Sequence, residues 1–272
     1  MNLYETLEEA ICSDSIIIKE KLTRQCLAYC NQNEFINAPK VLAKKFKVPS
    51  YAQKCEIVKP KSLVARKDFH TKEGLASLVH SIAHIEYSAI DLALDAVYRY
   101  SEMQQSFKVD WLEVALDEIR HYQILEELLI DLGFNYGDFT VHSGLFDAST
   151  NTAKSLLDRM AIIPRYYEAS GLDVTPQILK KLDNKRKIPS VKKLIEILDI
   201  IYVEEIVHVQ KGDYWFKKVC EIEGKESDVY FEILNRYNIL DKHRPHINVD
   251  ARKKAGFSCS EIKKLGKVDC FE

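Results

Sequence analysis

The 272-residue sequence predicts an all-α protein, built as a four-helix bundle with extra helices at its N- and C-terminal ends. Apolar residues recur at helical spacing through several long stretches. Only 9 Gly and 7 Pro interrupt the chain, whereas good helix formers are abundant. No stretch alternates apolar and polar residues for long enough to predict a strand. The composition, 46% apolar and 29% charged, excludes a collagenous or wholly disordered protein.

Charge and cysteine usage narrow the class of protein further. Lys and Arg total 39 against 41 Asp and Glu, which argues against non-specific nucleic-acid binding as the main task. The seven cysteines are odd in number and form no CxxC pair, so neither a disulfide framework nor a zinc ribbon is expected. The acidic start MNLYETLEEA does not resemble a signal peptide, and no apolar run approaches the roughly 20 residues of a membrane span. We expect a soluble protein of a reducing cytoplasm.

Residues 1–70 are predicted to form an N-terminal helical extension and a loop. The extension consists of helices at about 3–11 and 16–31, in which Cys26 and Cys30 lie one turn apart and are expected to be buried thiols. Residues 36–70 are rich in lysine and contain three prolines, Pro39, Pro49 and Pro60. This segment is expected to be a surface loop with a short helix.

The predicted bundle covers residues 71–222. Its first helix spans about 72–101. The second begins at Asp110, which with Glu113 forms a capping box, and ends near Leu132 before Gly133. Residues 133–150 show no clear period and serve as a long crossover between the second and third core helices.

The third bundle helix is predicted at about 151–170, ending at Gly171. Thr175 and Pro176 then restart a short helix, as a cap followed by proline at the first position. The loop DNKRKIP precedes Ser190, which caps a long fourth helix to about 222. Residues 223–272 are predicted as a C-terminal helix, at about 226–238, and a tail from 243 that wraps the surface.

Two segments repeat one chemical pattern, Glu118-x-x-His121 and Glu205-x-x-His208, each directly preceded by an acid, Asp117 or Glu204. Residues i and i+3 of a helix lie about 60° apart in azimuth and about 4.5 Å apart along the axis. Each pair therefore presents one oxygen donor and one nitrogen donor from the same face, where both can reach a common ion.

Four glutamates occupy apolar helix faces, where an unpaired carboxylate has a large desolvation cost. Each face is defined by its apolar members: Val79, Ile82, Ala83, Ile90 and Ala93 for Glu86; Val114, Ala115, Tyr122 and Leu125 for Glu118; Leu157, Met160, Ala161 and Pro164 for Glu168; Leu194, Leu198, Ile201 and Val209 for Glu205. One Glu from each of two helices and Glu-x-x-His from each of two others is the ligand set of a carboxylate-bridged dimetal site. Two divalent ions cancel the four negative charges, and these donors suit Fe, Mn or a mixed Mn/Fe pair better than Zn.

The spacing of the predicted ligands fits a bundle. Glu86 and Glu118 are 32 residues apart and Glu168 and Glu205 are 37 apart, so each pair can lie level in an antiparallel hairpin. The 18-residue crossover reaches about 60 Å when extended, enough to run back along the bundle.

The order Glu86, Glu118-x-x-His121, Glu168, Glu205-x-x-His208 resembles the ferritin-like superfamily, and Asp117-Glu118-x-Arg120-His121 resembles the signature of diiron oxygenases. AHIEYSAIDLALD, DEIRH and the Arg-Pro to Ala-Arg-x-x-Ala-Gly-Phe stretch (244–257) are closer to an uncharacterised bacterial ferritin-like family, similar to the diiron tRNA hydroxylases.

The resemblance implies a diiron oxidoreductase that activates O2, with hydroxylation as the expected reaction and an unknown substrate and an electron donor protein as partners. It also implies that Asp117 hydrogen-bonds His208 and Glu204 hydrogen-bonds His121, although Glu204 stands where Asp is usual and Val207 where Arg is frequent. A non-catalytic metal-binding or metal-stabilised helical protein is the alternative.

Three further groups have both a structural and a functional interpretation. His80 and His84 form an i,i+4 pair that fits a helix flank better than a second metal site. Tyrosines flank the ligands, where packing is the simpler role and radical transfer the alternative: Tyr87, Tyr122, Tyr166, Tyr167 and Tyr202. The basic run from Lys180 to Lys193 is expected to be a solvated helix connection, with an RNA surface as the alternative.

Overall fold

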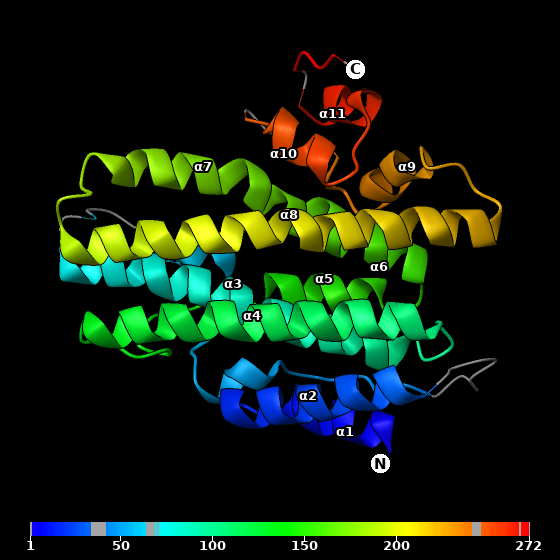
Figure 1. The fold of residues 1–272 in the computed structure, drawn as a ribbon, viewed down its shortest axis with the longest axis horizontal. Helices are drawn as coiled ribbons and strands as arrows, with labels where there is room; N and C mark the ends of the chain where they lie inside the picture. The colour runs from blue at the N-terminus through cyan, green and yellow to red at the C-terminus, as the bar shows by residue number, and fades with distance from the viewer. Residues whose placement is uncertain are drawn as a thin grey trace. The chain divides into compact units, whose positions relative to one another are not determined.

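The computed structural model describes residues 2–33, 42–63, 69, 71–240, 246–266 and 268–271. These residues form helices and connections, and their only extended pairing is an isolated bridge between Ile57 and Val141. Pro39, Arg244 and Pro245 lie outside the described residues. The principal helices are α1 (Leu3–Cys12), α2 (Ile16–Gln32), α3 (Lys72–Arg99), α4 (Gln105–Asp131), α5 (Gly144–Thr152), α6 (Leu156–Ile162), α7 (Ala169–Asp183), α8 (Pro189–Glu223), α9 (Val229–Arg236), α10 (Val249–Lys254) and α11 (Cys259–Gly266) (Figure 1). The predicted all-α class is confirmed for the part of the chain so described.

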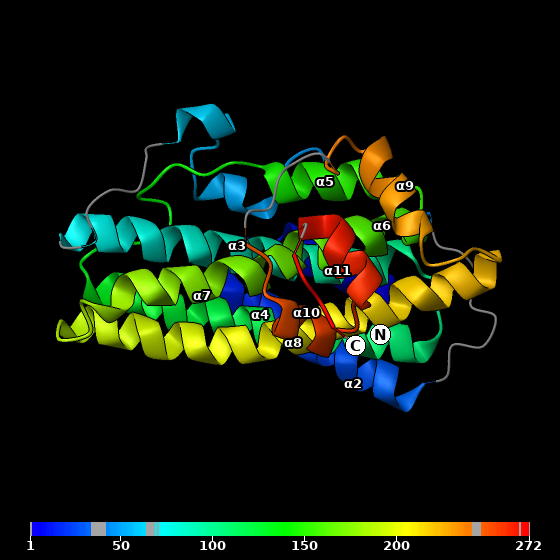
Figure 2. The ribbon, with the colours of Figure 1, turned by 90° about the horizontal axis from the view of Figure 1, so that it is seen from above.

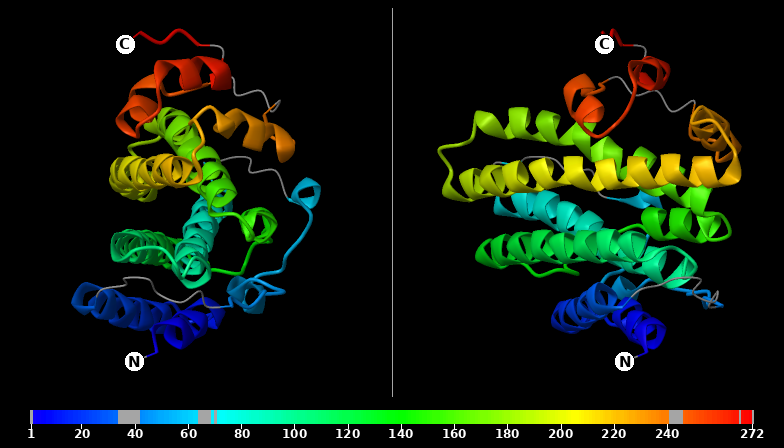
Figure 3. Two further views of the ribbon diagram at one scale, coloured as in Figure 1. Left: turned by 90° about the vertical axis from the view of Figure 1, so that its right-hand side faces the viewer. Right: turned by 45° about the vertical axis from the view of Figure 1, so that its right-hand side comes forward.

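The chain divides into two compact units. The first unit comprises Met1–Thr150 and Lys185–Ile197, and the second comprises Asn151–Asn184 and Leu198–Glu272. In the first unit α3 and α4 pack along each other, α1 lies against α3, and α2 lies against α4 (Figure 3). In the second unit α9 contacts α6, and α10 lies against α7 and α11 (Figure 2).

The predicted helices of the N-terminal extension and the first bundle helix are confirmed. Side chains cap all three at their N-termini: Asn2 for α1, Ser15 for α2 and Thr71 for α3. Cys26 and Cys30 are buried, as expected. Residues 42–63 are largely irregular, with short 3-10 turns at Ser50–Gln53 and Pro60–Ser62.

The predicted start of α4 at Asp110 is wrong, because the helix begins at Gln105. Two contacts hold the earlier turn in place: Gln105 donates to the carbonyl of Cys30 at 2.6 Å, and the buried Lys108 amine donates to the carbonyl of Ser101 at 2.8 Å. These two contacts, one of them to a residue 75 positions away, outweigh the capping pattern at Asp110. The predicted end is confirmed, since Gly133 adopts φ +85° just beyond the last turn.

The crossover after α4 is anchored on α3 by two histidines. His80 Nε2 accepts from the Gly137 backbone N–H at 3.0 Å, and His84 Nδ1 shares a 2.9 Å hydrogen bond with the Tyr136 hydroxyl. Both imidazoles are buried. These contacts support the structural interpretation of the pair. The helix α5 in this segment was not predicted, because residues 133–150 have no helical period.

The third bundle helix departs from prediction at three points. It begins at Leu156, with Ser155 as its N-cap, rather than at 151. It then widens into a π-helical turn, η3 (Ile163–Glu168), and continues without a stop at Gly171. Pro176 lies inside α7 rather than starting a new helix. Pro176 has no N–H to give to the carbonyl of Leu172, and the Asn248 side chain bonds that carbonyl instead.

The fourth helix and the C-terminal region largely follow the prediction. Pro189, rather than Ser190, opens α8, which reaches Glu223. The predicted helix at 226–238 is shorter, from Val229 to Arg236. The tail contains α10, α11 and a disulfide between Cys259 and Cys270, with Cα atoms 5.3 Å apart. Cysteine number and spacing gave no indication of this bond. Among the described residues, no helix is both long enough and apolar enough to cross a membrane.

A buried ion pair connects three helices of the first unit. The fully buried Lys19 of α2 pairs with Asp91 of α3, and its amine also donates to the carbonyls of Ala10 and Ile11 in the last turn of α1, at 2.9 and 3.2 Å. Burial raises the pKa of Asp91, and the charge of Lys19 opposes that rise. The Ser50 hydroxyl completes the site by donating to Asp91 at 2.7 Å.

We predict that Lys19→Met lowers the free energy of unfolding by about 3–5 kcal/mol, because it leaves the Asp91 carboxylate buried without its counter-charge. Urea denaturation measures the loss. The matched control is Lys21→Met on the exposed face of α2, which should have little effect. Adding Asp91→Asn to Lys19→Met should recover part of the loss. Equal stability of the Lys19 and Lys21 variants would contradict this role.

Candidate metal centre

Three of the six predicted ligands meet inside the first unit. Glu86 on α3 and Glu118 and His121 on α4 are 5%, 1% and 0% exposed. His121 Nδ1 lies 3.1 Å from Glu86 Oε2 and 3.5 Å from Glu118 Oε2. One ligand atom from each of the three falls within 4.8 Å of the others. The structure therefore contains a buried carboxylate and histidine cluster that could bind metal.

The sequence folds this way because α3 and α4 pack through the same apolar faces that carry the glutamates. The predicted neighbours of Glu86 and Glu118 on both faces are buried. The i,i+3 spacing on α4 then directs Glu118 and His121 to one side of that helix, and Glu86 faces them from α3. The apolar helix faces and the Glu-x-x-His spacing together predict these three residues.

Burial disfavours the charged forms of the two glutamates, and their negative charges repel each other. Burial and the neighbouring Glu118 charge raise the pKa of Glu86 to about 7. Burial disfavours the charged form of His121, but its hydrogen bonds and charge interactions with Glu118 and Glu86 outweigh that and raise its pKa to about 11. The site thus favours positive charge between its two carboxylates. Two carboxylates and an imidazole in so buried a place fit a divalent cation of borderline or hard character.

Three buried tyrosines pack on one another in the first unit. Tyr87 and Tyr122, which follow Glu86 and His121 directly in the chain, are fully buried, and their ring centroids are 5.2 Å apart. Tyr136 from the crossover stacks on Tyr87 at 5.4 Å and meets Tyr122 edge-on at 5.2 Å. Burial raises the pKa of all three phenols, so they remain neutral.

The other three predicted ligands belong to the second unit. Glu205 and His208 lie on α8, with Glu205 Oε1 3.4 Å from His208 Nδ1. His208 is buried, and so are Leu198, Ile201 and Val209 of the predicted stripe. Glu168 is the last residue of the π-helical turn η3.

The two acids that precede the Glu-x-x-His motifs are partly exposed. Asp117 forms an ion pair with Arg120 on its own helix at 3.1 Å, and both side chains are 42% exposed. Glu204 is half-buried on α8. Their expected hydrogen bonds to His208 and His121 stay predictions.

Sequence reasoning missed a set of buried charges in the second unit. Arg165 and Arg252 are both 0% exposed and pair with Asp213 and Asp173, respectively. A charged residue inside an apolar run, as in IIPRYY around Arg165, was the available signal.

Comparison with known proteins gives a relative from Haemophilus influenzae (strain ATCC 51907 / DSM 11121 / KW20 / Rd) that is described as "Uncharacterized protein". The two sequences are 37% identical over 230 residues, which cover 82% of this chain and 78% of the relative. No solved structure matches the chain. A family model described as "Protein of unknown function (DUF455)" matches residues 12–263. The match spans nearly the whole sequence, and the chain belongs to this family.

Proposed function

We propose that this protein is an oxidoreductase with a carboxylate-bridged pair of metal ions, with iron as the metal we favour, that activates O2 to oxidise a substrate. The observation that carries the proposal is the buried cluster of Glu86, Glu118 and His121. Such a cluster is unfavourable without positive charge.

In this proposal each unit supplies half of the ligand set. The first unit contributes Glu86 with Glu118 and His121, and the second contributes Glu168 with Glu205 and His208. The proposal makes the Glu205 carboxylate a further ligand beside the Glu86, Glu118 and His121 donors. Four carboxylates and two divalent ions form a neutral group, which a low-dielectric interior tolerates.

The proposed arrangement is a ferritin-like bundle of α3, α4, the α6 to α7 helix and α8, occupying residues 71–222. Two features support it: the ligand order along the chain, and the long connection between α4 and α6 that matches the crossover of such bundles.

Oxidative chemistry fits the surroundings of the cluster. Bound iron would supply electrons for the reduction of O2. The chain itself holds the donors on two packed helices, and burial of Glu86, Glu118 and His121 keeps bulk water from them. Hydroxylation is the reaction class we favour, and it requires an external electron donor.

The basic run does not extend the proposal to RNA. Lys193 pairs with Asp131 at 2.8 Å, and Lys192 lies 3.7 Å from Glu196. Lys185 lies over the ring of Phe69 at 5.5 Å. These cations already have partners within the protein, which favours the interpretation as a solvated helix connection.

We predict that Glu118→Gln weakens Fe(II) binding at least about 10-fold, because it removes a charged ligand while it keeps the volume of the side chain. Metal analysis after dialysis and metal-dependent O2 consumption measure the effect, and both should fall. Glu113→Gln on the exposed face of α4 is the matched control. Unchanged metal content and O2 consumption in the Glu118 variant would refute the assignment.

Removal of metal should destabilise the protein. Saturation at 100 times the dissociation constant contributes about 2.7 kcal/mol, which corresponds to a rise in Tm of several degrees for a chain of this size. Thermal melting with Fe(II), with Mn(II) and with a chelator measures the shift, and O2 consumption is followed in parallel. A stabilised protein that consumes no O2 with any electron donor would instead favour the metal-stabilised scaffold.

A further inference from the structure

The helix that carries Glu168 has two backbone defects. In η3 the Ala169 N–H bonds the carbonyl of Pro164, five residues back, so one extra residue is accommodated in the turn. Two turns further on, Pro176 has no N–H to give to the carbonyl of Leu172. Buried carbonyl groups that lose a helical partner need another donor.

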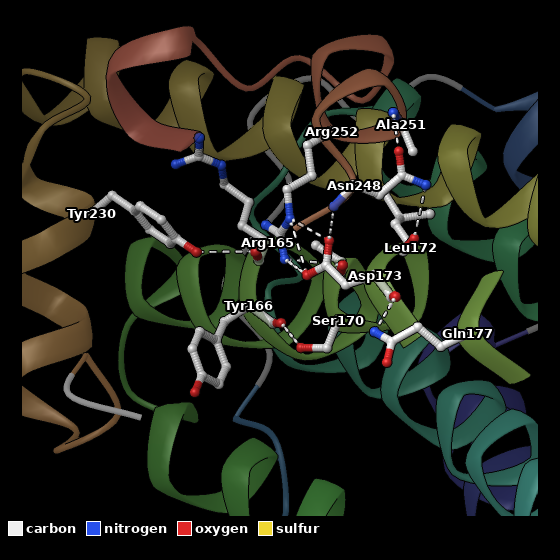
Figure 4. A network of polar contacts seen from close by, with 11 residues as sticks. Arg165, Tyr166, Ser170, Leu172, Asp173, Gln177, Tyr230, Asn248, Ala251 and Arg252 are labelled. Carbon is white, nitrogen blue, oxygen red and sulfur yellow. Dashed lines mark hydrogen bonds and ion pairs between the residues drawn. The ribbon is translucent and has the colours of Figure 1, made fainter. Parts of the chain in front are cut away.

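Side chains from elsewhere in the second unit bond backbone carbonyls of this helix, and the freed Leu172 carbonyl is one of them (Figure 4). Tyr230 of α9 donates to the carbonyl of Arg165 at 3.0 Å. Arg252 of α10 donates to the carbonyl of Ala169 at 3.1 Å, and Asn248 donates to the carbonyl of Leu172 at 3.3 Å. Tyr230 therefore bonds the backbone before Glu168, and Arg252 and Asn248 bond the backbone after it.

The same segment is fixed to α7 by a buried ion pair. Arg252 Nη2 lies 2.6 Å from Asp173 Oδ2, and Arg252 Nε lies 3.0 Å from Asp173 Oδ1. Asp173 Oδ1 also accepts from the Asn248 backbone N–H at 2.9 Å (Figure 4). Asn248 in turn donates to the Tyr202 hydroxyl at 2.7 Å, three residues before Glu205 on α8.

A second buried arginine joins η3 to α8 and α11. Arg165, three residues before Glu168, pairs with Asp213 at 2.9 Å and with Glu261 at 2.6 Å. Asp213 lies five residues after His208. Gly256 packs so closely on Asp213 that an added Cβ would lie 2.3 Å from its Oδ2. Phe257 lies under both guanidinium groups, at 4.7 Å from Arg165 and 5.0 Å from Arg252.

The charges of this network balance internally. Arg165, Arg252 and Lys217 face Asp173, Asp213 and Glu261, with Lys217 2.7 Å from Asp213. No net charge is left for an external ion to neutralise. Buried ion pairs add little net stability compared with apolar packing, but they can fix geometry. The network is therefore better explained by positioning than by ligand binding.

We propose that the segment Asn248–Glu261 is a clamp and that Arg252 and Arg165 are positioning residues for the ligands of the second unit. Arg252 holds the backbone on the C-terminal side of Glu168, and Arg165 ties the turn before Glu168 to the α8 turn after His208. The clamp thereby sets where the Glu168 and His208 donors lie. This inference rests on the proposed function, since it concerns ligands of the proposed metal pair.

The test uses the full-length protein loaded with Co(II), whose visible absorption reports ligand number and geometry. We expect Arg252→Gln to weaken Co(II) binding by about 10–100-fold and to change the absorption bands, while far-ultraviolet circular dichroism at 20 °C stays as in the wild type. Lys254→Gln, an exposed neighbour on α10, is the matched control and should match the wild type in both measurements. Asn248→Ala, which leaves the Arg252 and Asp173 side chains in place, should change the bands in the same direction but less, and it serves if Arg252→Gln does not fold.

The outcomes separate this inference from the proposed function. A wild-type protein that binds no Co(II) overturns both. If the wild type binds Co(II) and Arg252→Gln and Asn248→Ala bind it with unchanged affinity and absorption, the clamp is overturned and the metal site stands. A lower Tm in these variants with an unchanged Co(II) spectrum has the same meaning, because it shows a purely structural role.

Discussion

The fold of this protein depends on how it neutralises carboxylates that it buries. Glu86 and Glu118 lie in the same apolar interior as the residues that hold α3 and α4 together, with His121 between them. Asp91, Asp173 and Asp213 are also largely removed from water, and each faces a lysine or an arginine. An isolated buried carboxylate is too unfavourable for a chain with ordinary marginal stability. The helices that pack around each buried carboxylate must therefore also carry the positive group that neutralises it.

The two kinds of buried acid differ in what balances them. The aspartates are paired with fixed cations from the same unit, so the ion pairs are complete when that unit is folded. The glutamates of the first unit share one imidazole, whose pKa rises to about 11 because of their charges. A site that holds one proton between two carboxylates is suited to exchange that proton for a metal ion. This difference separates the structural ion pairs from the candidate metal centre.

Much of the fold and half of the ligand cluster could be predicted because they depend on local periodicity. Apolar residues at helical spacing predict α3 and most of α4. Together with the Glu-x-x-His motif they also predict that Glu86, Glu118 and His121 meet. The start of α4 at Gln105, the π-helical turn before Glu168 and the continuous helix through Pro176 were not predictable in this way. Each is maintained by a partner distant in sequence, such as Cys30 for Gln105 or Asn248 for Leu172. Local helix propensity carries no information about partners that lie far away in the sequence.

The pairing of Asp173 with Arg252 spans 79 residues. During synthesis, α7 is made long before the arginine that neutralises its buried acid. The nascent second unit must therefore keep Asp173 hydrated, and leave the irregular helix incompletely packed, until Arg252 has been translated. A chain that ends before Arg252 would be a helical intermediate with exposed apolar surface, a natural substrate for chaperones and proteases.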